Sequence, residues 1–349
     1  MTALNREILF SGHFDTMEAS ATIGIRVFGG LSYSLLSIFG LFLNSLLVVI
    51  LIHDRGALKK NAFYTITWQM VVCDVLTHTM EFIVPIPITF AGSDIYGASL
   101  FLHIPAFIDT IAYNGTLYFS VLMTFNRFTV FIVPRLNQML FHKPRLYFTI
   151  ASVWLWVILL VVGLNVFACY KSFSSSGFYY HHVCPPPETM SVFGGIINQF
   201  VSIGSTYFPV AMLVTYVVII VYIRLKISYE WRDGKLFHKT NARSYDVSLS
   251  SREFSLLAQS LIICGFLEVQ NLAFKFLPQI KPSGQWNYVI NFVENWISLL
   301  LNCIHPLVLF TFNKDIRKRL KALFIRYCRP PKVTVNIVPS VASIQISHY

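Results

Sequence analysis

Residues 100–133 form one long apolar run, LFLHIPAFIDTIAYNGTLYFSVLMTFNRFTVFIV, whose charged residues are Asp109 and Arg127. An α-helix makes five full turns in 18 residues, so these two residues lie on the same face, about 27 Å apart along the axis. A charged group facing lipid costs several kcal/mol, so both side chains must point toward neighbouring helices or water. The run therefore predicts a central membrane helix with an acid near one bilayer surface and a base near the other.

The composition also favours a membrane protein. Of the 349 residues, 55% are hydrophobic and 12% are charged, and the mean hydropathy is +0.60. Soluble domains average about 25% charged residues. The net charge of +11 does not indicate a nucleic-acid partner, because the basic residues cluster between apolar runs and in the tail rather than along one stripe.

Seven apolar runs reach the roughly 20 residues that a bilayer span needs. They are residues 28–53, 63–90, 100–133, 147–169, 193–224, 253–278 and 288–313. With the N-terminus outside, the extracellular segments hold only five of the 27 Lys and Arg residues: Arg6, Arg26, Lys171, Lys275 and Lys281. Because basic residues stay on the cytoplasmic side, the sequence predicts an all-α membrane protein, a seven-transmembrane helix bundle with N-out/C-in orientation and the lipid bilayer as its surroundings.

The segments around the bundle follow from the same pattern. Residues 1–27 are expected to be an extracellular N-terminus, 28–313 the transmembrane domain, 314–328 a short basic amphipathic helix on the membrane surface, and 329–349 a disordered cytoplasmic tail. Cys328, at the end of the amphipathic helix, is a lipidation candidate; a free cytosolic thiol is the alternative.

Several polar residues and prolines fall inside the predicted spans. An ionisable group at mid-bilayer is a functional candidate by default, and Asp74 occupies such a position in the second span. We expect a hydrogen-bonded activation core around Asp74, with Asp74 as a candidate sodium ligand through its oxygens. Simple inter-helix hydrogen bonds are the alternative. The residues of this core are Asn44, Asp74, Thr116, Pro209, Asn302, His305 and Pro306.

These features together resemble the rhodopsin-like G-protein-coupled receptors over about residues 28–328. The resemblance is carried by Asn44, Asp74, the Asn126-Arg127-Phe128 triplet, Pro209, Pro306 and the Phe312-Asn-Lys-Asp-Ile-Arg stretch. Within that superfamily, the triplet and the Glu253-Phe-Ser-Leu-Leu-Ala-Gln-Ser stretch are most similar to the nematode serpentine chemoreceptors, with class x as the candidate class. The resemblance implies a small-molecule ligand such as an odorant, a heterotrimeric G protein that contacts Asn126, Arg127 and Phe128, and no cofactor.

The sequence also departs from the family pattern. Asn126 stands where an acid usually precedes the arginine, so the resting contact of Arg127 lacks an adjacent carboxylate. His305-Pro306 replaces the usual Asn-Pro pair. No cysteine lies at the start of the third span, so Cys169 and Cys184 are the disulfide candidate, because the exterior is oxidising. A buried, reduced Cys169 is the alternative.

Polar residues in the outer halves of the spans suit a ligand cavity with a few orienting groups. They are Asp109, Tyr113, Asn198, Gln199, Glu268, Asn271, Glu294 and Asn295. The resemblance places Asp109 where amine receptors carry the counter-ion of their ligand. Alternatively, these acids lie in a water-filled mouth or pair with Lys275 or Lys281.

The sequence therefore predicts a G-protein-coupled chemoreceptor of the plasma membrane, with a sensory cilium as a candidate location. An enzyme is not expected, because no His-Glu-x-x-His or nucleophile-base pattern occurs. The seventh span has no lysine for a Schiff base, which argues against a light sensor. A heptahelical ligand-gated cation channel of the odorant-receptor type and a small multi-span transporter remain as alternatives.

Overall fold

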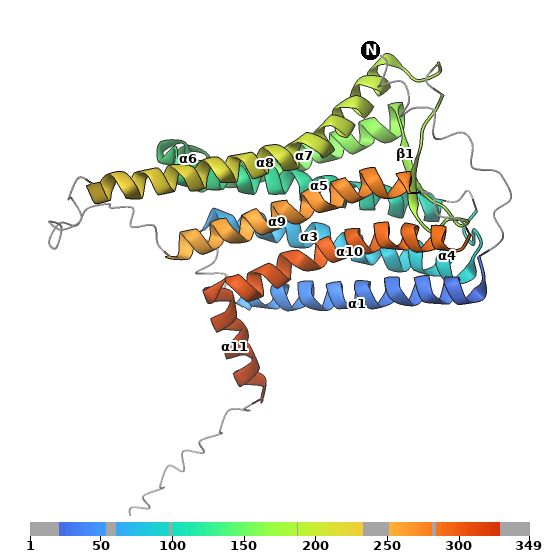
Figure 1. The fold of residues 1–349 in the computed structure, drawn as a ribbon, viewed down its shortest axis with the longest axis horizontal. Helices are drawn as coiled ribbons and strands as arrows, with labels where there is room; N and C mark the ends of the chain where they lie inside the picture. Colours follow the sequence, from blue (N-terminus) through green and yellow to red (C-terminus); the bar gives the residue numbers. More distant parts are fainter. Residues whose placement is uncertain are drawn as a thin grey trace, which may run out of the picture.

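The computed structural model describes residues 21–53, 61–97, 100–186, 188–232, 251–280 and 284–328. Long helices run side by side through this part of the chain (Figure 1). In chain order they are α1 (Ile23–His53), α3 (Ala62–Ile83), α4 (Pro85–Ala91), α5 (Leu100–Phe131), α6 (Pro134–Phe141), α7 (Arg145–Phe167), α8 (Val192–Arg232), α9 (Ser251–Phe276), α10 (Trp286–Phe312) and α11 (Lys314–Cys328), with strands β1 (Tyr170–Phe173) and β2 (Tyr180–Val183) between α7 and α8 and a 3-10 turn η3 (Leu277–Gln279) after α9.

Each predicted span corresponds to a helix or a pair of helices. The structure differs from the prediction in two of the spans and in the segments between spans. The second span is interrupted at Val84, where α3 ends and α4 begins with Pro85 at its first position. A proline at the start of a helix loses no hydrogen bond, because that N–H has no partner inside the helix anyway. Helix α8 continues to Arg232, beyond the predicted end at residue 224. The short helix α6 and the β1–β2 hairpin were not expected.

The flanking segments agree only in part with the predicted boundaries. Helix α1 begins at Ile23, inside the predicted extracellular N-terminus, and α11 spans the predicted amphipathic helix. Residues 1–20 and 329–349 lie outside the described residues, so the prediction of a disordered tail stays a prediction.

Among the described residues, six helices are long and apolar enough to cross a membrane, counting α3 and α4 as one. Helix α5 has 32 residues but carries more polar side chains, and most of these are buried. The reason is its position, because α5 packs against α3, α7, α8 and α9 at the centre of the bundle. A central helix needs less apolar surface than one that faces lipid.

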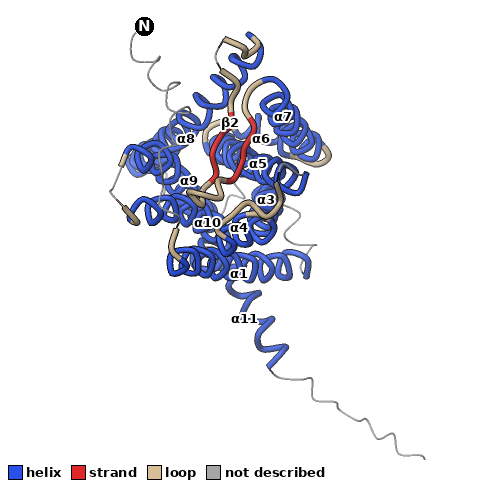
Figure 2. The backbone as a smooth tube through the Cα atoms, turned by 90° about the vertical axis from the view of Figure 1, so that its right-hand side faces the viewer, coloured by secondary structure: helices blue, strands red, loops and turns tan. Residues whose placement is uncertain are grey.

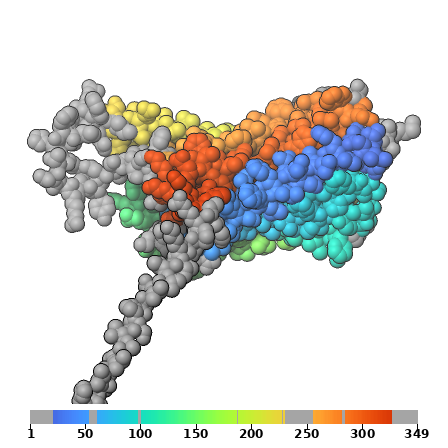
Figure 3. Space-filling view, turned by 90° about the horizontal axis from the view of Figure 1, so that it is seen from below, coloured from blue at the N-terminus to red at the C-terminus, as the bar shows by residue number. Residues whose placement is uncertain are grey.

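Helix α1 shows the opposite pattern. It lies on the outside of the bundle, blue in Figure 3, and exposes large apolar side chains such as Leu31, Leu35 and Phe42. An exposed apolar face of this kind suits contact with lipid rather than water.

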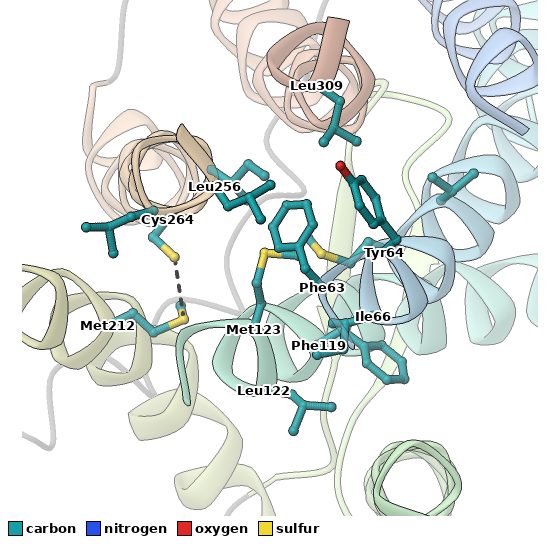
Figure 4. Packing of buried hydrophobic residues seen from close by; sticks show 14 of the residues in the cluster. Phe63, Tyr64, Ile66, Phe119, Leu122, Met123, Met212, Leu256, Cys264 and Leu309 are labelled. Atoms are coloured by element: carbon teal, nitrogen blue, oxygen red, sulfur yellow. Dashed lines mark hydrogen bonds between the residues drawn. The ribbon is translucent and has the colours of Figure 1, made fainter. Parts of the chain in front are cut away.

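Apolar side chains from five helices fill the middle of the bundle. Figure 4 shows them converging: Phe63 of α3, Met123 of α5, Met212 of α8, Leu256 of α9 and Leu309 of α10. Helices α3 and α5 approach closely at Gly115, where a Cβ atom would lie 2.6 Å from the Cys73 sulfur. A larger residue at that position would force these two helices apart.

The bundle has two distinct ends. At one end, called the hairpin end here, β1 and β2 pair in antiparallel fashion and lie across the helix ends (Figure 2). A disulfide between Cys169 and Cys184 joins the two sides of the hairpin. At the other end, called the α11 end, α11 leaves the bundle after α10 (Figure 1).

Candidate functional site

The clearest polar contact at the hairpin end joins a helix to the hairpin. Lys171 of β1 forms an ion pair with Asp109 of α5. The Lys171 side chain is 19% exposed and the Asp109 side chain 7%. The Lys171 ammonium also lies 4.0 Å from the centre of the Tyr180 ring. Lys275 and Lys281 were the alternative partners considered for the acids, and Asp109 pairs with Lys171 instead.

Further carboxyl groups surround this ion pair. Glu81 of α3 is 2% exposed, accepts a hydrogen bond of 3.3 Å from Asn295 of α10, and interacts electrostatically with both Asp109 and Lys171. Glu294 of α10 also interacts electrostatically with Lys171. Glu81 and Lys171 were not among the predicted ligand residues. An acid inside the second span was a usable signal for Glu81, whereas nothing in the sequence singled out Lys171.

The hairpin itself contributes unusual groups to the hairpin end. The Tyr180 hydroxyl is buried and has no hydrogen-bond partner among the described residues. Burial raises the pKa of Tyr180 well above its ordinary value, and the nearby carboxyl groups of Asp109 and Glu81 raise it further. Tyr33 of α1 is fully buried and donates to the Phe178 carbonyl oxygen at 2.9 Å, which connects α1 to the hairpin turn.

The other predicted ligand residues lie at different depths. One turn further along α5, Tyr113 donates to the Asn271 side-chain oxygen at 3.0 Å. Glu268 is half-buried, and one of its oxygens has no partner within the described chain. Asn198 lies beside Cys169, with 3.7 Å between its side-chain oxygen and the sulfur, and Gln199 is exposed. Asp109, Glu294 and Asn295 therefore gather around Lys171, while Asn198 and Gln199 do not.

A second buried pair lies deeper in the bundle. The His305 Nδ1 atom is 3.0 and 2.8 Å from the two oxygens of Asp74, and the side chains are 1% and 0% exposed. Nearby, the Asn44 amide donates to the Asn302 carbonyl oxygen at 3.1 Å. The buried Thr116 accepts a hydrogen bond through its carbonyl oxygen from Ser120.

The contact between His305 and Asp74 limits the oxygens available at the predicted sodium site. Both oxygens of Asp74 are within hydrogen-bond distance of the imidazole, so an ion would have to share them with His305. The sodium site stays a prediction. The two core prolines lie inside long helices, Pro209 in α8 and Pro306 directly after His305 in α10.

At the α11 end, Arg127 is 1% exposed. Its guanidinium donates to the Asn126 side-chain oxygen at 2.8 Å and lies 5.1 Å from the centre of the Phe63 ring. The Asn126 amide in turn donates to the side-chain oxygen of Asn137 of α6 at 3.2 Å. The Thr129 hydroxyl donates to the same Asn137 oxygen at 3.3 Å. Asn137 was not among the predicted residues, because no sequence pattern indicates that α6 contacts Asn126.

Two more predicted residues belong to this end. Phe128 is half-buried and packs against the large apolar cluster. The backbone of α11 extends to Cys328, but the side chain of Cys328 lies outside the described residues, so lipidation there stays a prediction.

Comparison with known proteins places the chain in a family. Residues 35–313 match the family model of the serpentine type 7TM GPCR chemoreceptor Srx. The chain belongs to this family. This Srx chemoreceptor also resembles a solved structure described as the crystal structure of squid rhodopsin, with a TM-score of 0.71 and 14% sequence identity over 89% of each chain. No curated protein sequence matches the chain.

Family and fold together confirm several predictions. The protein is a G-protein-coupled chemoreceptor with the seven-helix bundle of rhodopsin, a multi-pass membrane protein, and a receptor rather than an enzyme. A small-molecule ligand and a G protein are therefore its partners in general. The channel and transporter alternatives are not needed.

Proposed function

We propose that this receptor resides in the plasma membrane, sensory cilia included, with its hairpin end outside, and binds a small-molecule chemical cue there. Binding favours a state in which α8 and α9 separate at the α11 end and a heterotrimeric G protein reaches Arg127. A ligand can shift the two states only by its differential affinity for them. The residues at the two ends of α5 are the main contacts in this proposal.

The orientation is supported by the distribution of charge. Exposed basic residues gather at the α11 end, such as Arg135, Arg224, Lys314 and Lys321. The hairpin end carries fewer basic groups, and the disulfide between Cys169 and Cys184 suits an oxidising exterior. An epitope tag at the N-terminus is then accessible to antibody on intact cells. Staining that requires permeabilised cells would contradict the orientation.

The observation that carries the signalling proposal is the burial of Arg127 at the α11 end. A guanidinium that is 1% exposed is unavailable to a partner in this state, so a partner that uses it requires a different state. Its contacts with Asn126 and Phe63 are the contacts that change.

The experiment compares three receptors in cells that express a promiscuous G protein, screened with small organic molecules. The wild type responds to at least one compound. Arg127→Ala reaches the surface and binds that compound but does not signal. The matched control Arg135→Ala, at an exposed position of α6, signals normally. Normal signalling by Arg127→Ala would contradict the proposed role of the arginine.

A further inference from the structure

The ion pair between Lys171 and Asp109 has a consequence for the ligand. Lys171 is the second residue of a four-residue strand, and its side chain reaches from the hairpin to a buried carboxylate of the central helix. The Tyr180 ring covers the ammonium at 4.0 Å. A carboxylate on one side and an aromatic face on the other form a binding site for an organic cation, since both attract an ammonium group.

The charge around this site selects the class of ligand. Carboxyl groups of Glu81, Asp109 and Glu294 all act on the single ammonium of Lys171. A further positive charge beside these carboxyl groups favours their ionised form, whereas a negative charge disfavours it. A bound cation also keeps buried carboxyl groups ionised, because it offsets the cost of their desolvation.

Unused hydrogen-bonding groups lie in the same region. The buried Tyr180 hydroxyl has no partner among the described residues, although it is close enough to Asp109 and Glu81 to interact with them electrostatically. Further along the same face of α5, Tyr113 uses the Asn271 oxygen, and the Asn271 amide nitrogen is buried without a partner in the described chain. Buried polar groups normally have partners, so these atoms point to contacts that a ligand makes.

The exposure and the long side chain of Lys171 make an exchange feasible. Lys171 has a flexible stem, lies on a two-stranded hairpin and retains 19% exposure, so its ammonium can return to water when it leaves Asp109. Exchanging one ammonium for another preserves the charge of the site. The cost of exposing an unpaired buried carboxylate therefore does not arise.

We propose that Lys171 is a resident cation of the ligand site, and that the activating ligand is a small organic cation that displaces it from Asp109. This rests on the proposed function for the location of the site, but it adds the class of ligand and a residue that competes with it. The apparent affinity of such a ligand is lowered by the fraction of receptors in which Lys171 occupies Asp109.

The test measures binding to purified receptor directly, without a G protein. The probes are primary alkylammonium and arylalkylammonium ions, with carboxylates of the same length as controls. If Lys171 occupies Asp109 in about nine molecules of ten, Lys171→Met binds the cations about tenfold more tightly than wild type. Lys171→Arg stays near the wild-type value, and Asp109→Asn binds them more weakly. Lys275→Met, at an exposed lysine of α9, behaves as wild type.

Several results would overturn the proposal. Unchanged or weaker cation binding by Lys171→Met, stronger binding of the carboxylates, or binding that survives Asp109→Asn would each do so. The proposal would also be overturned if none of the cations bound to a purified receptor whose cooperative unfolding shows that it is folded. If neutral compounds activate the receptor and Lys171→Met leaves that activation unchanged, this inference is overturned and the proposed function stays intact. Cation binding with the expected pattern but without G-protein activation would overturn the proposed function instead.

Discussion

Two buried carboxylates of the bundle hold basic partners, and the partners differ in kind. Asp109 is paired with a lysine on a hairpin, and the lysine side chain is 19% exposed. Asp74 is paired with a histidine on the neighbouring helix α10, and neither side chain is more than 1% exposed. The hairpin lysine lies where solvent reaches its side chain, whereas His305 and Asp74 are enclosed between α10 and α3. The first pair suits ligand exchange, and the second suits a contact that holds the helices together.

The largest expected difference between the two pairs concerns stability. Removing one partner of a fully buried pair leaves the other uncompensated and costs about 3–5 kcal/mol. His305→Ala should therefore lower the free energy of unfolding by about that amount. Lys171→Ala should lower it by less, because the Lys171 side chain is 19% exposed and water can reach the site that it leaves. Thermal unfolding of the purified receptor in detergent measures both.

A second variant checks the physical reason. Adding Asp74→Asn to His305→Ala removes the uncompensated carboxylate and should recover part of the loss. A Lys171→Ala receptor that is less stable than His305→Ala would reverse the proposed division between the two pairs.

The disulfide should affect the hairpin end alone. Cys169 and Cys184 are 15 residues apart, and closing a loop of that length stabilises by up to about 3 kcal/mol. A reducing agent should therefore lower the unfolding temperature of the wild type but not of the Cys169→Ser/Cys184→Ser variant. Cys303→Ser, at a buried free cysteine, should keep the response to reductant. No effect of reductant on the wild type would mean that the hairpin is held by other contacts.

The smallest expected effect is a pH dependence of the hairpin. Burial lowers the pKa of His181 in β2 below its ordinary value of 6.5. The unfolded hairpin therefore takes up the proton first, so the contribution of His181 to stability is complete well above pH 6.5 and declines as the pH falls through that value. The wild type should lose thermal stability between about pH 7.5 and about pH 5.5. His181→Gln should lose less, and an equal loss would assign the effect to another group.

The sequence was most informative about features that lie within a single helix. The 18-residue spacing placed Asp109 and Arg127 on one face, and both residues are buried in the structure. The apolar runs located the helices, and Pro85 marks the point where the second span is interrupted. These features depend on local period and on residue type, which a single sequence contains.

The partners of those residues were harder to predict. Lys171 lies 62 residues from Asp109, in a short hairpin between two spans, and only the fold brings it to the carboxylate. Asn137 reaches Asn126 through α6, an eight-residue helix without a marking pattern. Contacts of this kind depend on how the loops fold back onto the bundle, which periodicity does not determine.

The central claim is that the hairpin end and the α11 end are coupled through α5, and thermodynamic reciprocity tests it most directly. If ligand binding favours the state that a G protein contacts, the G protein must raise the affinity for the ligand by the same factor. The measurement is the affinity of purified receptor for an activating compound, with and without nucleotide-free G protein. We expect the G protein to raise it at least about fivefold in the wild type. We expect no rise in Arg127→Ala. An equal affinity with and without G protein in the wild type would contradict the account.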